Sequence, residues 1–299
     1  MKDPHLLLIR FSALGDVAMT VPVIRCLYKT YPGLKITFVS RPYVSPLFQE
    51  FKNFNFYPTD FNGRHKGIKG LWTLFQELKT TTFSGVADLH GVLRTHPLYL
   101  FFLLYGYKVK SIHKGRLDKK ALTRPKNKKF QPLTPTIYRY ADVFRKLGFP
   151  LSFDQHDFPE KRDLPMSLLT LYQRSEKKWI GIAPYAAHSG KKYPLDLMQQ
   201  VINFLQKDHQ IFLFGQGEYE INKLEVWSNA YKNVFSGHTL GSFNNELEII
   251  SNLDLMISMD SANGHLAANY NVPVITLWGL THPFGGFAPF LSTQENMLV

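Results

Sequence analysis

Asp-Ser-Ala-Asn-Gly-His-Leu-Ala-Ala-Asn-Tyr-Asn-Val-Pro-Val-Ile-Thr-Leu-Trp-Gly, residues 260–279, predicts a turn, a short helix and a returning strand. The apolar run 253–258 just before it predicts another strand. Asp260 and Ser261 then fall where the helix would begin, and the small residues after them allow backbone N–H groups to approach an anion closely. The stretch therefore predicts a strand–loop–helix unit that faces a phosphate.

A second segment, near the start of the chain, has the same pattern. Residues 6–10, Leu-Leu-Leu-Ile-Arg, predict a strand, and residues 11–16, Phe-Ser-Ala-Leu-Gly-Asp, predict the loop that leads into an amphipathic helix. Two strand–loop–helix sites in the two halves of the chain predict a cleft between two α/β domains.

Strand-like and helix-like runs alternate along the whole chain, which is typical of parallel sheets covered on both faces. The predicted strands are 5–10, 34–39, 85–89, 107–112, 179–184, 209–214, 253–258 and 272–277. The predicted helices are 17–30, 68–80, 136–147, 194–207 and 242–251. The stretch 149–178 lacks a strand signal and contains three prolines, so we expect one domain over residues 1–160 and another over residues 161–299.

Composition excludes several classes of protein. The chain has 299 residues and is 44% hydrophobic, enough for a sizeable core. Its single cysteine, Cys26, excludes a disulfide framework and predicts a reducing compartment. The longest apolar run, 98–107, is too short to span a bilayer, and residues 1–5 show no signal peptide. We therefore expect a cytoplasmic protein.

The net charge of +12 is concentrated in one segment. Residues 108–129 contain ten Lys or Arg against one acid, Asp118. Such a segment suits a nucleic acid, an anionic membrane surface or a phosphorylated substrate, or it is a solvated loop. No aromatic residue is interleaved with these charges, which argues against a stacking platform for single-stranded nucleic acid.

Three loops contain residues suited to chemistry. Asp16, after Gly15, is either a general base that projects into the cleft or a helix cap. Lys191, in the loop after strand 179–184, either neutralises a diphosphate as a point charge or lies on an exposed turn. The spacing around Lys191 does not match a phosphate-binding P-loop.

The third loop, Gly215-Gln216-Gly217-Glu218, follows strand 209–214 and has space to bind a ribose hydroxyl or a base. A dinucleotide fingerprint would need a third glycine, so a nicotinamide cofactor is not expected. His265 is either a packed helical histidine or a ligand-binding group. The spacings of metal-binding motifs are absent from the sequence, so we expect neither a metal nor a cofactor.

Taken together, the motifs resemble glycosyltransferase family 9, the lipopolysaccharide heptosyltransferases. The residues that carry the resemblance follow in this order: Ile9-Arg10-Phe11-Ser12-Ala13-Leu14-Gly15-Asp16 with Pro22, Asp88-Leu89-His90-Gly91 with Arg94, Lys191-Lys192-Tyr193-Pro194, Gly215-Gln216-Gly217-Glu218, and Asp260-Ser261-Ala262-Asn263-Gly264-His265-Leu266-Ala267-Ala268. They span nearly the whole chain.

The resemblance implies an α/β protein of the GT-B fold, two Rossmann-like domains with parallel sheets that face each other across a cleft. It implies inverting, metal-independent transfer of a sugar from a nucleotide-diphosphate donor, with ADP-heptose favoured, to a lipopolysaccharide core or related glycolipid. Asp16 matches the general base of the family. The implied donor-binding residues are Lys191, Gly215, Gly217, Glu218, Asp260, Ser261, Ala262, Asn263, Gly264 and His265.

The first domain is where the family binds its acceptor, and the basic segment suits a phosphorylated, membrane-anchored glycolipid. We therefore expect peripheral contact with the inner-membrane surface and no nucleic-acid partner. The expected acceptor-binding residues are Ser12, Arg94, Arg116, Lys119, Lys120 and Arg124.

The sequence departs from the family pattern in three places. Ala262 replaces a glycine, Tyr193 replaces the tryptophan of the Lys-x-Trp-Pro motif, and the chain ends twenty residues after Gly279, which suggests missing C-terminal helices. Two alternatives stay open. One is another GT-B enzyme such as a nucleotide-sugar 2-epimerase, and the other is a non-catalytic protein that binds polyanions or lipopolysaccharide.

Overall fold

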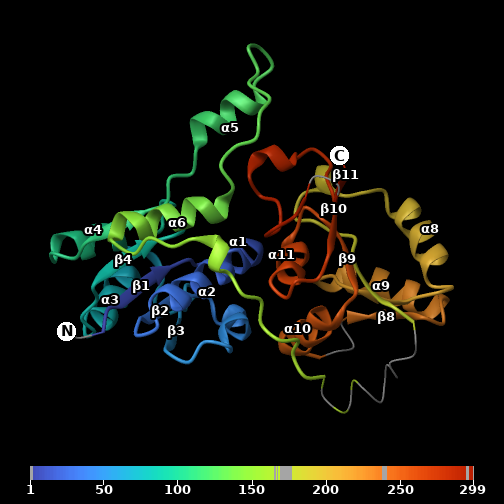
Figure 1. Ribbon diagram of the computed structural model, residues 1–299, viewed down its shortest axis with the longest axis horizontal. Helices are drawn as coiled ribbons and strands as arrows, with labels where there is room; N and C mark the ends of the chain where they lie inside the picture. Colours follow the sequence, from blue (N-terminus) through green and yellow to red (C-terminus); the bar gives the residue numbers. More distant parts are fainter. Residues whose placement is uncertain are drawn as a thin grey trace. The chain divides into compact units, whose positions relative to one another are not determined.

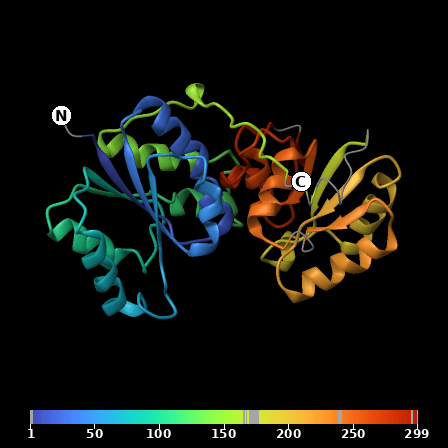
Figure 2. The same ribbon diagram turned by 90° about the horizontal axis from the view of Figure 1, so that it is seen from below.

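The structure is a computed structural model that describes residues 3–164, 166, 168, 177–237, 241–293 and 296–298 (Figure 1). The chain divides into two compact units, Met1–Asp157 and Phe158–Val299. Each unit has its own parallel sheet with helices packed against it (Figures 1 and 2).

The first unit contains a five-stranded sheet in the order β3-β2-β1-β4-β5, and every neighbouring pair is parallel. Its strands are β1 (His5–Ile9), β2 (Lys35–Ser40), β3 (Phe54–Pro58), β4 (Gly85–Asp88) and β5 (Val109–Ser111). Its helices are α1 (Leu14–Ala18), α2 (Val21–Thr30), α3 (Gly67–Leu78), α4 (His96–Leu104), α5 (Arg116–Thr123) and α6 (Thr136–Leu147), with 3₁₀ turns η1 (Pro42–Phe48) and η2 (Phe153–Gln155).

The second unit contains a six-stranded parallel sheet in the order β11-β10-β9-β6-β7-β8. Its strands are β6 (Trp179–Ala183), β7 (Gln210–Leu213), β8 (Val234–Ser236), β9 (Leu255–Met259), β10 (Val274–Leu277) and β11 (Met297–Leu298). Its described helices are α8 (Leu195–Leu205), α9 (Glu218–Ala230), α10 (Phe243–Asn252) and α11 (Ala262–Ala268), with 3₁₀ turns η3 (Ser189–Lys191) and η5 (Pro283–Gly285).

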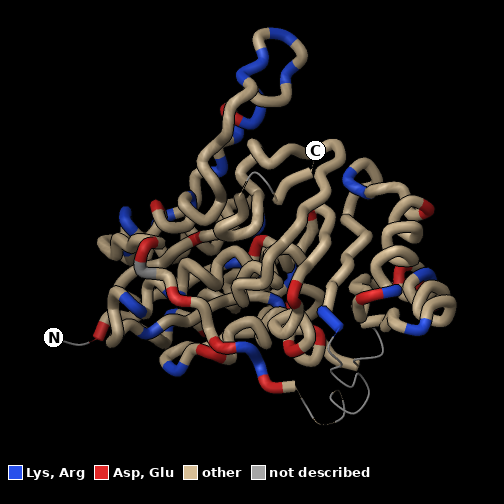
Figure 3. Tube along the Cα trace, turned by 45° about the vertical axis from the view of Figure 1, so that its right-hand side comes forward, with Lys and Arg blue, Asp and Glu red and all other residues tan. Residues whose placement is uncertain are grey.

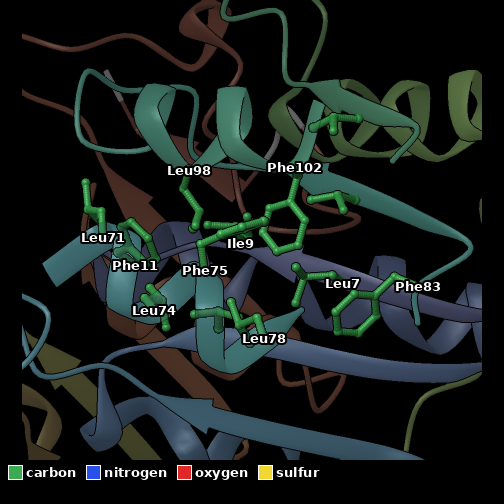
Figure 4. Packing of buried hydrophobic residues seen from close by; sticks show 13 residues of the cluster. Leu7, Ile9, Phe11, Leu71, Leu74, Phe75, Leu78, Phe83, Leu98 and Phe102 are labelled. Atoms are coloured by element: carbon green, nitrogen blue, oxygen red, sulfur yellow. The ribbon is translucent and has the colours of Figure 1, made fainter. Parts of the chain in front are cut away.

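The central strands form because they are apolar on both faces. Every residue of β6, and all but the first of β1 and β9, is buried, as expected for strands covered by helices on both sides. In the first unit, α3 and α4 lay apolar side chains over β1, where Leu74, Phe75 and Phe102 pack around Leu7 and Ile9 (Figure 4).

All eight predicted strands are confirmed within a few residues of their ends. Strands β3, β8 and β11 were not predicted. The prediction of one helix over 17–30 is wrong, because α1 ends at Ala18 and α2 begins at Val21. Pro22 has no N–H to continue the first helix, and the Thr20 hydroxyl donates to the Val17 carbonyl (2.6 Å) where the helix stops.

Two further features bear on the composition. Cys26 is buried in α2, and burial raises the pKa of its thiol to about 11, so the thiol stays protonated. In the described parts of the chain, every helix is too short or too polar to cross a membrane.

Candidate active site

The predicted residues of the second unit lie in the segments that follow the carboxyl ends of three neighbouring strands, β9, β6 and β7. Because the strands are parallel, these segments emerge at the same edge of the sheet. The sheet therefore brings the segment after β6 and the turn after β9 together, although they are about seventy residues apart in sequence.

Lys191, Asp260 and Thr281 form one polar cluster at this edge. The Lys191 Nζ pairs with an Asp260 carboxylate oxygen at 2.5 Å, and the Thr281 hydroxyl donates to the same oxygen at 2.8 Å. The Asp260 side chain is only 7% exposed, whereas that of Lys191 is 24% exposed. The cation is therefore oriented by a buried carboxylate and remains accessible to a ligand.

The loop after β10 fixes the position of Lys191. The Leu280 N–H donates to the Gly190 carbonyl at 2.8 Å. A side chain at Gly279 would overlap that carbonyl oxygen and would come within 3.1 Å of the Lys191 Cα, so the two loops approach each other too closely for any residue but glycine.

The turn after β9 leads directly into α11, as predicted. Ser261 is the N-cap residue of α11, and its hydroxyl lies 3.1 Å from that of Ser258. Ala262, Asn263 and Gly264 form the first turn of the helix, and His265 is buried in its interior. Ala262 and Asn263 are partly exposed, whereas Gly264 and the histidine are buried.

The loop after β7 has a built-in bend. Gly217 has φ +84°, a conformation that favours glycine, and the Gly215 Cα faces the Leu224 side chain. Glu218 begins α9 and is exposed, whereas a Glu220 carboxylate oxygen accepts from the Gln216 N–H at 2.9 Å. Of the two acids, Glu218 is thus the one left to contact a ligand.

In the first unit, the Asp16 carboxylate pairs with the Arg10 guanidinium at the carboxyl end of β1. Arg10 also donates to the Leu89 carbonyl at 2.7 Å, and its side chain is only 6% exposed against 30% for Asp16. Asp16 is the third residue of α1, behind an Ala13 N-cap, so the alternative reading of Asp16 as the helix cap is wrong. The described residues engage one carboxylate oxygen and leave the other open.

A buried network supports this pair. The Tyr140 ring is fully buried with the Arg10 guanidinium 6.0 Å above it, and its hydroxyl donates to the Asp16 carbonyl at 3.2 Å. Arg10 is therefore held by a backbone carbonyl, an aromatic face and a carboxylate.

Asp88, at the end of β4, shapes the neighbouring loop. Its carboxylate accepts from the N–H groups of His90 and Gly91 (3.0 and 2.9 Å) and from the hydroxyls of Thr95 and Ser111 (2.9 and 3.0 Å). It is completely buried. The Asp88-Leu89-His90-Gly91 motif thus fixes the loop that holds Arg10.

Positive charge surrounds Asp16. Burial, and then the charges of Arg10, Lys114 and Arg94, lower the pKa of His90 to about 3, so this imidazole is neutral. The pKa of Lys114 is lowered, first by burial and then by Arg10, and that of Lys119 is lowered by burial and then by Arg139. Both lysines lie within electrostatic reach of the Asp16 carboxylate.

A cavity of about 270 Å³ lies beside this cluster in the first unit. Its polar lining includes His96, Lys114 and Arg116, and the loop through Gly115 (φ +58°) leads from it into α5. In Figure 1, α5 and the segment after it project from the unit, and Figure 3 shows the Lys and Arg residues along them.

The predicted acceptor residues do not form one group. Arg116 lines the cavity, Lys119 lies near Asp16 and Lys120 is exposed on α5. Arg124 donates to the Asn127 carbonyl at 2.7 Å, and Arg94 lies 5.2 Å over the Phe61 ring. Ser12 is partly exposed in the loop before α1.

Sequence reasoning missed Arg10, Lys114 and Thr281 as site residues. The signal available for Arg10 was its position, because it is a charged residue at the end of an apolar strand. Thr281 had no local signal, because its role depends on a partner that is 21 residues away. Across the described residues, no group of three or more His, Cys, Asp or Glu is arranged to hold a metal ion.

Comparisons with known proteins agree with this architecture. The model of glycosyltransferase family 9, the heptosyltransferases, matches residues 71–298. The lipopolysaccharide core heptosyltransferase OpsX of Haemophilus influenzae is 22% identical over 287 residues, which cover 93% of this chain and 80% of OpsX.

Two solved structures share the fold. A family 9 glycosyl transferase from Veillonella parvula superposes with a TM-score of 0.76 at 18% identity, covering 100% of this chain and 87% of that one. The heptosyltransferase WaaC of E. coli, solved with ADP, gives a TM-score of 0.73 at 15% identity, covering 99% and 92%. The predicted fold class, two parallel-sheet α/β domains of the GT-B type, is confirmed.

Proposed function

Because the chain belongs to glycosyltransferase family 9, the heptosyltransferase family, we propose that it transfers a heptose from ADP-heptose to a lipopolysaccharide core acceptor, with inversion at the anomeric carbon. The relative OpsX is named a lipopolysaccharide core heptosyltransferase, and WaaC was solved with ADP. The observation that carries the proposal is the Asp16 carboxylate, which Arg10 orients and which keeps one oxygen open.

Asp16 acts as the general base in this proposal. Its open oxygen takes the proton from an acceptor hydroxyl, whose oxygen then attacks the anomeric carbon opposite the leaving diphosphate. The bond from that carbon to the diphosphate oxygen breaks as the new glycosidic bond forms, and ADP leaves. A single displacement inverts the configuration and requires one base and no covalent intermediate.

The second unit binds the donor in this proposal. Lys191 and the first turn of α11 stabilise the developing charge on the diphosphate, and Glu218 with Gly215 and Gly217 contacts the nucleoside. Fixed positive charge from Lys191 supports transfer without a metal, and full activity in EDTA would agree with this. Loss of activity in EDTA that Mg²⁺ restores would refute it.

The variant Asp16→Asn tests the base. Turnover should fall about 10²–10⁴-fold, the usual contribution of positioned proton transfer. The calorimetric affinity for ADP should not change, because Asp16 lies in the other unit. Asp142→Asn is the matched control, because it removes an ion-paired carboxylate on α6 outside the site. Near-normal turnover of Asp16→Asn would refute the assignment.

The basic helix α5 serves the acceptor in this proposal, and the enzyme works in the cytoplasm at the inner-membrane surface where that glycolipid is anchored. Replacing Lys119, Lys120 and Arg124 with Ser should raise the KM for a phosphorylated glycolipid acceptor and leave ADP affinity unchanged, because these charges belong to the first unit and Lys191 belongs to the second. A weakened affinity for ADP with a normal acceptor KM would mean that the two units are assigned the wrong way round.

A further inference from the structure

Helices α3 and α4 of the first unit together expose an apolar surface, the α3–α4 patch. On the inner side, Leu71 and Leu74 of α3 and Leu98 and Phe102 of α4 are buried against the sheet (Figure 4). On the outer side, large apolar side chains face solvent instead of polar ones. The exposed members are Ile68, Trp72, Leu100, Leu103, Leu104 and Tyr105.

Ring contacts join the two helices into one surface. Trp72 of α3 lies 4.9 Å from Phe101 and 6.4 Å from Tyr105, measured between ring centroids. Leu104 is 81% exposed and Ile68 is 70% exposed, and a contiguous exposed apolar surface of this kind marks an interaction site. A helix that is apolar around its whole circumference, as α4 is (His-Pro-Leu-Tyr-Leu-Phe-Phe-Leu-Leu), is unusual at a surface in contact with water.

The charges in the two segments that form the patch are positive with one exception. Segments 66–79 and 93–108 contain one acid, Glu77, which is mostly buried and pairs with Arg64 and His65. The cations in these segments are Lys66, Lys69, Lys79, Arg94 and Lys108. Lys79 lies within the patch itself, with its Nζ 4.9 Å from the Tyr105 ring centroid.

We propose that the α3–α4 patch docks this protein on an anionic phospholipid surface. Leucine, tryptophan and tyrosine side chains would enter the boundary between headgroups and acyl chains, and the lysines would stay at the level of the phosphates. The surface is separate from α5, and it adds a lipid contact to the proposed use of a glycolipid acceptor without depending on that use.

A second copy of the chain is the less suitable occupant. In a two-fold contact the same patch meets itself, so Lys79 and its neighbouring cations would face an identical set. The net charge of +12 adds to that repulsion, whereas an anionic bilayer is complementary to both the cations and the apolar side chains.

Tryptophan fluorescence can test the docking directly. The chain has four tryptophans, and Trp179, Trp227 and Trp278 are buried, whereas Trp72 is 39% exposed in the patch. Vesicles of phosphatidylglycerol and phosphatidylethanolamine should shift the emission to the blue, and Trp72→Phe should abolish the shift without abolishing co-sedimentation. Vesicles of phosphatidylcholine alone, or added salt, should weaken binding.

The double variant Ile68→Gln with Leu104→Gln should lower the vesicle partition coefficient about tenfold or more, because two exposed apolar side chains are lost from the contact. The matched control is Phe204→Gln with Val226→Gln, which replaces two highly exposed apolar residues on α8 and α9 of the second unit (70% and 61%). The control pair should bind like the unchanged protein, and all three proteins should melt at the same temperature.

Three results would overturn the proposal. One is equal vesicle binding by the double variant. Another is binding with no change in Trp72 emission, together with loss of binding when the α5 cations are replaced. The third is a dimer in analytical ultracentrifugation that the double variant converts to a monomer, since the patch would then be covered by a second copy.

Discussion

At the scale of single residues, Arg10 fixes the orientation of the Asp16 carboxylate. A guanidinium has five N–H donors in fixed geometry, and here one donates to the Leu89 carbonyl and another to the Asp16 carboxylate. A freely rotating Asp16 would point its oxygen at a substrate only part of the time. Arg10 is therefore a positioning residue for the proposed base.

Replacing Arg10 with Lys should keep the charge and lose this geometry. Turnover should fall about tenfold while the acceptor KM changes little, and the free energy of unfolding should fall by about 1–3 kcal/mol, because one buried hydrogen bond is lost. The control is Arg25→Lys, which breaks a similar two-bond pair with Glu50 in the same unit. An equal loss of turnover in both variants would reduce the role of Arg10 to stability.

His90 makes the free energy of unfolding depend on pH. The pKa of its side chain is lowered from 6.5 to about 3, so between these values the folded chain binds fewer protons than the unfolded chain. The free energy of unfolding therefore falls as pH drops through this window. His90→Gln should recover about 1 kcal/mol at pH 5 relative to pH 7.5, an amount reduced because the ring is partly exposed.

Urea unfolding at both pH values measures this effect. His96→Gln, at an exposed histidine in the same unit, should leave the difference between the two pH values unchanged. If His90→Gln loses as much stability on acidification as the unchanged protein, other groups account for the acid sensitivity.

At the scale of elements, the close approach of two loops holds Lys191 in place. Gly279→Ala should push the loop after β10 away from Gly190 and Lys191, because the added Cβ overlaps backbone atoms that cannot rotate aside. ADP affinity in calorimetry should fall roughly tenfold, about 1.4 kcal/mol. Gly285→Ala is the control, since its Cβ would make only ordinary contact with Phe287. Equal ADP affinity for both variants would contradict this account.

The elements that could be predicted from the sequence are those with a clear apolar pattern, either a period or a short continuous run. Strands β1, β6 and β9 are short apolar runs buried on both faces, and the pattern shows this directly. The edge strand β3 (Phe-Asn-Phe-Tyr-Pro) is half-exposed and ends in proline, and β11 is only two residues long. Helix α4 is apolar on all sides and so has no helical period.

For the candidate site, the loops could be predicted from the sequence, but the partners of their residues could not. Glycine and acidic residues at strand ends mark the loops of Asp16, Lys191 and Asp260, because parallel strands bring such ends to one edge. The partners could not be predicted. Whether Asp16 caps α1 or pairs with Arg10 depends on where the preceding strand points the arginine, which no local pattern encodes.

At the scale of the whole molecule, donor and acceptor functions are assigned to different units. Saturating ADP, about 100 times its Kd, should stabilise only the second unit, by about 2.7 kcal/mol. In a Trp72→Phe background, all remaining tryptophans lie in that unit, so the melting transition seen by fluorescence should rise by roughly 5–10 °C. Hydrogen exchange should slow in segments 188–193 and 260–265 and not in segments 10–16 and 88–94. The opposite pattern would reverse the assignment of the units.

We expect the Lys191–Asp260 pair to make the proposed donor site selective among anions. Before any ligand arrives, the lysine already has a carboxylate partner, so an incoming anion gains only the difference between two interactions. Chloride has too little charge to displace a buried carboxylate, whereas a diphosphate can bind Lys191 from its open side. We therefore expect Asp260 to compete with simple anions for Lys191 and to reduce their binding. Asp260→Asn should make ADP binding markedly more sensitive to chloride, and equal salt sensitivity would show that the lysine needs no such screen.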